Sequence, residues 1–450
     1  MTGPQWNLPP GLKHSLPFYA LKPWVKLGEP IRLFEHLHAT YGPVAHYRFM
    51  GTPIIFINHP DYIREILITQ ASAFIKERTV RRMKILLGNG LITSEEPLHI
   101  RQRRIVAPAF HRQRIAAYAD EIVTIAARRR DQWQSGQTVD ISAEMMSLSL
   151  EIIARTLFNT DVTDDVRRIN DEVNAIMEIY NFLVAFPRME QFLFLPHPKI
   201  IRFRRSKARL DAVVNRLIIE HRASGRDRGD LLSMLIRSRN EEDSTGMSDE
   251  QIRDEVLTIF LAGYETVANA LTWTWYLLSQ NPETEKKLHA ELDTVLNQKL
   301  PTLADCPKLC YTEQVFAESM RLYPPAWAMG RQSTHPITLG PYRIPPGAHF
   351  FFSQYILGRT PEYYPDPLRF APDRFNLENS ATRPRFAYFP FGAGSRQCIG
   401  ESFAWMEGVL TIAIIAQRWR MNYLGTSPPI PQAKITLRPR DPLLMQLAPR

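Results

Sequence analysis

Residues 391–400 read Phe-Gly-Ala-Gly-Ser-Arg-Gln-Cys-Ile-Gly, and they carry more information than any other stretch of this 450-residue chain. Glycines allow a backbone to wrap closely under a flat group. A helix is predicted directly after Cys398, and a helix N-terminus beside a sulfur favours its thiolate form. Arg396 is suited to pairing with a carboxylate. A lone cysteine in a glycine-rich turn is more often simply buried, so the spacing must decide between the two interpretations.

The spacing of the loop is specific. Five of its residues fit the pattern F-x-x-G-x-R-x-C-x-G, which average residue frequencies would produce in about one chain in ten thousand. The pattern resembles the haem-binding loop of the cytochrome P-450 family, and the likeness extends from about residue 30 to the C-terminus. The resemblance implies haem b as the cofactor and Cys398 as the axial ligand to its iron. It also places the following residues beside the haem: Phe391, Gly392, Arg396 and Gly400.

A long helix is predicted well before the loop. Ser248 begins a capping box in which Gln251 is the third helical residue, and nothing breaks the helix before Asn281-Pro282. Its length of about 48 Å would cross a whole domain. Gly263 lies in its interior, where glycine is less stable than alanine by about 1 kcal/mol, so a packing or functional reason is expected.

The residues around Gly263 read Ala262-Gly263-Tyr264-Glu265-Thr266. On the pattern alone, a glycine-tolerant helix with a solvated glutamate is the more common explanation. The segment is similar, however, to the A-G-x-D/E-T segment of the same family. The resemblance implies that Ala262 and Gly263 leave room for dioxygen over the haem, where the helix widens locally, and that Glu265 and Thr266 are catalytic residues that relay protons.

Glu318 and Arg321 lie three residues apart on a predicted helix that ends at Pro324-Pro325, so their side chains can meet. An exposed pair of this kind would stabilise the fold by well under about 1 kcal/mol. Residues 371–375, Ala-Pro-Asp-Arg-Phe, are similar to the family's P-E/D-R-F segment. The resemblance implies a structural triad of Glu318, Arg321 and Arg374 that holds the cysteine loop.

His99 and Arg103 are four residues apart on another predicted helix and share one face of it. In the resembled family this pair, often with tryptophan in the first position, binds the haem propionates; His99 departs from that pattern and still offers a donor. Arg331 matches a further propionate partner. For each of the three, an ordinary surface side chain is the alternative.

The segments that line the pocket in the resembled family are apolar in this chain. They comprise Met83, Leu86, Leu87, Ala262, Ala326, Trp327, Ala328 and Met329. Residues 182–203 are rich in aromatic side chains and resemble the family's lid over the substrate entrance, although a helical core face is an equal alternative. We expect a lipophilic substrate: a fatty acid, a terpenoid or a steroid. The helix after Cys398 resembles fatty-acid-oxidising members somewhat more than others.

No flavin or iron–sulfur domain fits in the roughly 50 residues after the loop, so electrons are expected from a ferredoxin or flavodoxin with its reductase. An acidic protein of this kind suits a predicted basic cluster, for which a solvated helix face is the alternative. The cluster comprises Arg101, Arg104, Arg112 and Arg114.

The periodicity of the apolar residues indicates a mainly α fold with small β-sheets, in one domain over residues 1–450 with an irregular, proline-rich segment at 1–30. The resemblance implies that the haem lies between the long central helix and the cysteine-loop helix. The net charge is +9, but the basic residues are dispersed and no nucleic-acid-binding motif accompanies them. Three cysteines indicate a reducing cytoplasm, and Cys306-x3-Cys310 lacks the further ligands of a metal site. No signal peptide or transmembrane anchor is expected.

The leading hypothesis is therefore a monooxygenase that uses dioxygen. A peroxide-driven enzyme or an isomerase of the same fold is one alternative, but such relatives typically lose the acid–alcohol pair that Glu265 and Thr266 form. A non-catalytic haem sensor or carrier is another alternative, and it would need no proton relay.

Overall fold

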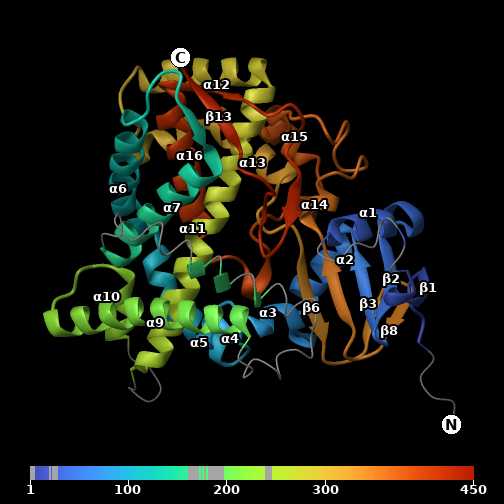
Figure 1. The fold of residues 1–450 in the computed structure, drawn as a ribbon. Helices are drawn as coiled ribbons and strands as arrows, with labels where there is room; N and C mark the ends of the chain where they lie inside the picture. Colours follow the sequence, from blue (N-terminus) through green and yellow to red (C-terminus); the bar gives the residue numbers. More distant parts are fainter. Residues whose placement is uncertain are drawn as a thin grey trace, which may run out of the picture.

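The long helix predicted from Ser248 runs through the centre of the helical part of the molecule (Figure 1). The computed structural model describes residues 6–19, 22, 29–160, 172–173, 175–176, 179–180, 197–238 and 246–450. Helix α11 (Asp249–Gln280) begins as predicted, because the Ser248 Oγ accepts a hydrogen bond from the Gln251 N–H at 3.1 Å. It packs most extensively on α7 (Ile141–Phe158). Most of its residues are buried, as expected for a central strut.

Helices surround α11 on several sides (Figure 1). Apolar residues recur at helical spacing in residues 115–130, 145–157, 166–186 and 207–223, which predicts four helices. The first, second and fourth are confirmed, and the third lies largely outside the described residues. The further α-helices are α1 (Pro30–Tyr41), α2 (Pro60–Arg64), α3 (Arg78–Arg82), α4 (Lys84–Leu87), α5 (Leu98–Val106), α6 (Arg112–Asp131), α9 (Pro198–Ser224), α10 (Leu231–Arg237), α12 (Pro282–Leu296), α13 (Cys310–Leu322), α14 (Gln354–Leu357), α15 (Leu377–Ala381) and α16 (Glu401–Ala416). A π-helical turn (Glu65–Thr69) follows α2.

A six-stranded sheet of order β1-β2-β3-β9-β6-β4 lies beside the helical part (Figure 1). Its strands are β1 (Gly11–Ser15), β2 (Val44–Phe49), β3 (Thr52–Ile57), β4 (Phe74–Lys76), β6 (Met329–Ser333) and β9 (His349–Phe352). Smaller sheets contain β5 (Thr138–Asp140), β7 (Ile337–Leu339), β8 (Tyr342–Ile344), β10 (Trp419–Tyr423), β11 (Pro431–Ala433), β12 (Leu437–Pro439) and β13 (Leu444–Pro449). The mainly α fold with small sheets is confirmed.

One prediction about the N-terminal segment is wrong. Residues 1–30 were expected to be irregular, but β1 pairs in parallel with β2 at the edge of the sheet. Gly11 makes this possible, because a Cβ at that position would lie 1.9 Å from the His46 carbonyl oxygen. Leu12 is buried and fixes the strand against the core. Within the described part of the chain, no helix has the length and apolar character needed to cross a membrane.

Candidate active site

The loop before α16 is closed by a backbone hydrogen bond from the Cys398 N–H to the Phe391 carbonyl at 2.9 Å. Gly392 and Gly394 adopt positive φ angles of 70° and 76°, a region that glycine enters without strain. A Cβ at Gly394 would also lie 2.3 Å from a backbone oxygen of Leu67. Gly400 differs, because its φ of −88° is open to any residue. Its place as the N-cap of α16 is what brings its N–H to the cysteine sulfur.

The Cys398 side chain is accessible, although protein surrounds it densely enough for burial to raise the pKa of its thiol. The Gly400 N–H and the positive charge of Arg103 oppose this rise.

Helix α11 shows a similar local opening. Its interior is buried almost throughout, yet Ala262, Gly263, Glu265 and Thr266 are only half-buried. Both elements therefore have unpacked surface, which a flat group between them requires.

Positive charge is concentrated near this loop. Arg331 on β6, Arg396 in the loop, Lys76 at the end of β4 and His99 on α5 influence one another's ionisation. Burial and the neighbouring Arg396 charge lower the pKa of Lys76 to about 7 and that of Arg331 to about 10. Glu95 pairs with Arg396 at 2.5 Å, so the cations outnumber their carboxylate. A cluster of this kind favours an anionic ligand.

Arg396 supplies the most direct sign of that ligand. Its Nη1 is buried and has no hydrogen-bond partner in the part of the chain that the structure describes. A buried guanidinium nitrogen is costly when unpaired, and a carboxylate is its natural partner. The donors present thus fit the two propionates of a haem whose iron is bound by Cys398. Sequence reasoning missed Lys76, since no motif accompanies it.

His99 and Arg103 share a helix but have different surroundings. His99 is buried beside the cations, and its Nδ1 lies 3.1 Å from a carboxylate oxygen of Glu96. Arg103 instead donates from Nη1 to the Gln397 carbonyl at 2.7 Å. The structure therefore brings His99 to the cation cluster, whereas Arg103 holds the residue that precedes Cys398.

Glu265 is held by a residue that sequence reasoning missed. The Thr436 hydroxyl donates to Glu265 Oε1 at 2.5 Å, and the Asn269 amide donates to the same hydroxyl at 3.1 Å. Since the Thr436 oxygen already accepts from Asn269, its hydrogen is directed at the carboxyl group. Burial raises the pKa of Glu265, and the Thr436 hydrogen bond together with two cations of the β11–β12 hairpin opposes the rise.

We expect Thr436→Val to raise the pKa of Glu265 further, because it removes a donor that favours the carboxylate. The infrared carbonyl band of the protonated acid, identified by its loss in Glu265→Gln, should then persist to higher pH. Thr436→Ser keeps the donor, so in this variant the Glu265 carboxyl group should titrate as it does in the wild type. An unchanged midpoint in Thr436→Val would show that the hydrogen bond does not control this acid.

The predicted widening of α11 is absent, since the helix stays α-helical from end to end. The Thr266 hydroxyl donates to the Ala262 carbonyl at 2.9 Å instead. Gly263 has a packing reason: a Cβ there would lie 2.8 Å from Ile153 Cδ1 of α7. A Cβ at this position would displace the end of the Ile153 side chain, so glycine lets α7 and α11 pack closely.

Glu318, Arg321 and Arg374 come together in the core. Glu318 and Arg321 are buried and form a two-point ion pair, with 2.6 Å between Nε and Oε2 and 2.7 Å between Nη2 and Oε1. Arg374 Nε lies 3.4 Å from Glu318 Oε1. Arg321 also donates to backbone carbonyls in residues 358–369. The triad thus joins α13 to the irregular segment that leads to the cysteine loop.

The predicted pocket residues fall into two groups. Leu86 and Leu87 are buried in the main core, and Met83 packs against it half-buried. Residues 326–329 are all half-buried, and the Met329 methyl group would contact a Cβ at Gly392 at 3.0 Å. Met329 therefore lies against the cysteine loop, whereas Trp327 and Ala328 pack on the core that Phe34 and Phe56 help to form. Most of the aromatic segment at 182–203 lies outside the described residues.

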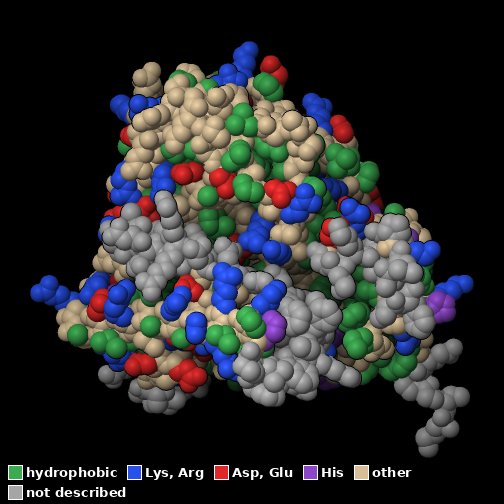
Figure 2. All heavy atoms as spheres, in the orientation of Figure 1, with side chains coloured by type: hydrophobic (Ala, Val, Ile, Leu, Met, Phe, Trp, Pro, Cys, Tyr) green, Lys and Arg blue, Asp and Glu red, His purple; other side chains and the backbone are tan. Residues whose placement is uncertain are grey.

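The predicted basic cluster is only partly described. Arg104 is exposed on α5, and Arg101 is half-buried on the same helix. Arg114 donates to the Gly229 carbonyl at 2.8 Å. The side chain of Arg112 lies outside the described residues. Figure 2 shows a hollow above one end of α9, with Lys and Arg side chains gathered beside it.

The chain is similar to known proteins over most of its length. The cytochrome P-450 family model matches residues 9–446. The chain is 39% identical to cyclooctatin synthase of Streptomyces melanosporofaciens over 429 residues, which cover 94% of this chain and 92% of that protein. It is 36% identical to cyclooctat-9-en-7-ol 5-monooxygenase of the same organism over 399 residues, covering 87% and 85%.

The fold is similar to that in the crystal structure of the cytochrome P450DA heme domain. The TM-score is 0.87 at 24% identity, and 99% of each chain is covered. The family match spans almost the whole chain and includes Cys398 and its loop. This chain therefore belongs to the cytochrome P-450 family of haem-dependent monooxygenases.

Proposed function

We propose that this protein hydroxylates a lipophilic terpenoid at a haem b bound through Cys398. The observation that carries the proposal is the accessible Cys398 thiol beside a cation cluster in which Arg396 Nη1 lacks a partner. When bound, the haem supplies the activation of dioxygen and the transfer of one oxygen atom. His99, Arg331, Arg396 and Lys76 would hold its propionates. Arg103 would keep the cysteine loop in place through Gln397.

The substrate class is inferred from the pocket and from the relatives. Met83, Leu86, Leu87 and residues 326–329 offer mainly apolar contacts, which favour a hydrocarbon skeleton. One relative is named for oxidising cyclooctat-9-en-7-ol, an alkenol. Together these favour a terpenoid over the fatty acids and steroids that the sequence also allows.

A spectral titration of the haem-loaded protein tests the substrate class. Terpenoid hydrocarbons and alcohols should displace water from the iron and shift its spin state at micromolar concentrations, more tightly than fatty acids or steroids of similar carbon number. A preference for fatty acids would overturn the terpenoid proposal while leaving the monooxygenase intact.

Electrons are proposed to come from a ferredoxin or flavodoxin with its reductase, in the cytoplasm. Support comes from Arg104, which is exposed on α5 and directly follows Arg103, the residue that bonds to the cysteine loop at Gln397. An acidic partner would dock there. Charge reversal at Arg104 should lower the reduction rate and its salt dependence without changing the haem spectrum. An unchanged rate would place the docking surface elsewhere.

Thr266→Ala should uncouple electron use from product formation without unfolding the protein. The substitution removes one hydroxyl from a long, well-packed helix, so little structure depends on it. That hydroxyl is proposed to donate protons at the dioxygen site. We expect the ratio of hydrogen peroxide released to product formed to rise by about tenfold.

The measurement compares NAD(P)H consumed, peroxide released and product formed with the same redox proteins. Thr266→Ser retains the hydroxyl and should stay close to the wild type. Equal coupling in wild type and Thr266→Ala would remove Thr266 from the mechanism and would favour the peroxide-driven alternative.

A further inference from the structure

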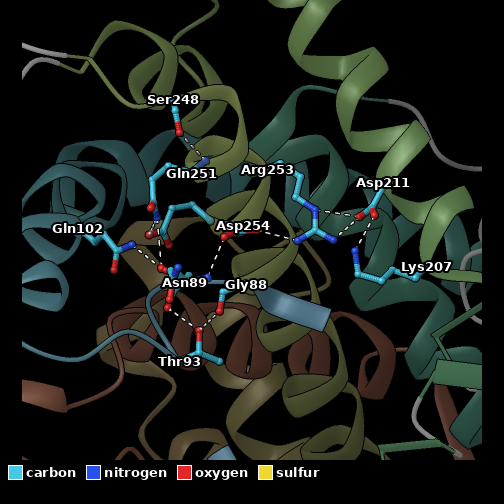
Figure 3. Close-up of polar contacts among 12 residues, drawn as sticks. Gly88, Asn89, Thr93, Gln102, Lys207, Asp211, Ser248, Gln251, Arg253 and Asp254 are labelled. Atoms are coloured by element: carbon cyan, nitrogen blue, oxygen red, sulfur yellow. Dashed lines mark hydrogen bonds and ion pairs between the residues drawn. The ribbon is translucent and has the colours of Figure 1, made fainter. Parts of the chain in front are cut away.

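Three consecutive charged residues, Arg253, Asp254 and Glu255, lie in the second turn of α11, well before the catalytic residues (Figure 3). The side chains of Asp254 and Arg253 are only 5% and 11% exposed, and Glu255 is fully buried. Buried charges are costly unless their partners are precisely placed. Neither the sequence motifs nor the proposed chemistry accounts for them.

The two carboxylates bind the backbone of the segment that follows α4. Asp254 Oδ2 accepts from the Asn89 N–H at 2.7 Å, and Glu255 Oε2 accepts from the Leu91 N–H at 3.0 Å. The Asn89 carbonyl in turn accepts from the side-chain amides of Gln102 at 2.5 Å and Gln251 at 3.3 Å. Residues 88–93, here called the clasped loop, are thus held at both donor and acceptor groups.

Two glycines let the clasped loop lie directly against α11. A Cβ at Gly88 would lie 2.0 Å from Asp254 Oδ2, and a Cβ at Gly90 would lie 2.0 Å from Thr258 Oγ1. Glycine at both positions therefore lets the loop lie close enough to α11 for Asp254 and Glu255 to bind its backbone N–H groups. Leu86 and Leu87, which precede the loop, are buried in the main core and connect it to Met83, the half-buried residue of the proposed pocket wall.

Arg253 extends this network to α9. Its Nη1 donates to Asp254 Oδ1 at 2.7 Å, and its Nε donates to Asp211 Oδ1 of α9 at 2.8 Å. Lys207, one turn earlier on α9, donates to the other oxygen of Asp211 at 2.8 Å. Figure 3 shows an unbroken path of ion pairs and hydrogen bonds from α9 through α11 to the clasped loop.

A second ion pair between α9 and α11 provides a comparison. Arg222 pairs with Asp249, but their side chains are 46% and 64% exposed. Among the described residues, no hydrogen bond or ion pair of Arg222 or Asp249 reaches the clasped loop. Asp249 therefore serves as a matched control for Asp211.

We propose that Arg253, Asp254 and Glu255 are positioning residues that fix one wall of the substrate pocket and make its position depend on α9. The assignment of the wall rests on the proposed function. A displacement of α9 that separates Asp211 from Arg253 leaves the Arg253 charge unpaired on that side, which weakens its hold on Asp254. The clasped loop then loses the Asp254 anchor, and the pocket wall loosens at Met83.

Amide hydrogen exchange of the haem-loaded, full-length protein tests the coupling. In Asp211→Asn, exchange at the Asn89 and Leu91 amides should accelerate by about tenfold, although Asp211 contacts neither residue. Asp249→Asn should leave these amides unchanged. Asp254→Asn should accelerate the Asn89 amide more than Asp211→Asn does. Exchange that accelerates only within α9 in Asp211→Asn would overturn the proposal.

Binding of azole inhibitors supplies a second readout, because azoles coordinate haem iron whatever the natural substrate is. Asp211→Asn should change the dissociation constant of a bulky azole, clotrimazole, by about tenfold while that of imidazole, which is too small to need the wall, stays constant. An equal change in both dissociation constants, or no change in either, would refute a role of this network in the pocket. A failure of the terpenoid proposal would leave both expectations intact.

Discussion

Replacing Cys398 by serine is expected to abolish the haem-thiolate spectrum. A neutral hydroxyl cannot replace a soft, anionic sulfur as a ligand to iron. Serine is close to cysteine in size, and the loop is held by the backbone bond to Phe391 and by two glycines with positive φ, so its shape should persist. The reduced carbon monoxide complex of the wild type should show the red-shifted Soret band of a thiolate-bound haem, and the variant should lack it.

The other two cysteines are matched controls. Cys306 and Cys310 are free thiols near the start of α13, and serine in their place should leave the band unchanged. A wild type without the band, or a Cys398→Ser variant that keeps it, would disprove the assignment of Cys398.

Loss of Glu318 should have the largest effect on stability. In Glu318→Ala the buried Arg321 guanidinium keeps its backbone carbonyl partners but loses its carboxylate partner, and the Ala371 N–H loses an acceptor at 2.9 Å. Breaking a buried pair in this way costs about 3–5 kcal/mol, a large part of the 5–15 kcal/mol that stabilises a typical domain. The yield of folded, haem-loaded protein should therefore fall severely.

Haem content and the urea midpoint of unfolding measure this effect. Lys287→Met is the control, since it removes an exposed ion pair to Asp373, a neighbour of Arg374 in the sequence, and should change neither quantity appreciably. Normal haem content and an unchanged midpoint in Glu318→Ala would show that the buried triad is dispensable.

Features encoded by neighbouring residues could be predicted from the sequence. The N-cap at Ser248 and the placement of Glu318 one turn from Arg321 depend on spacing within one helix, and the structure contains both. The cysteine loop is contiguous, so its pattern was visible in ten residues. Periodicity likewise located α6, α7 and α9.

Contacts between distant segments could not be predicted in this way. Thr436 lies 171 residues after Glu265, and nothing in its own neighbourhood indicates a partner. Lys76 is a single lysine at the end of a short strand. It can be recognised as part of a cation cluster only when the fold brings Arg331 of β6 and Arg396 of the loop beside it. The approach of Ile153 to Gly263 could not be predicted either, because it depends on how α7 crosses α11.

The length of α11 has a consequence for how this enzyme can change. Glu265 follows Asp254 by eleven residues, which separates the two by about 16 Å along the helix axis. Substitutions farther apart than about 7–10 Å, with no shared partner, have nearly additive effects. Variants of residues 253–255 should therefore combine independently with variants of the proton relay. If both proposed roles hold, substrate range and oxygen chemistry can evolve separately on one helix.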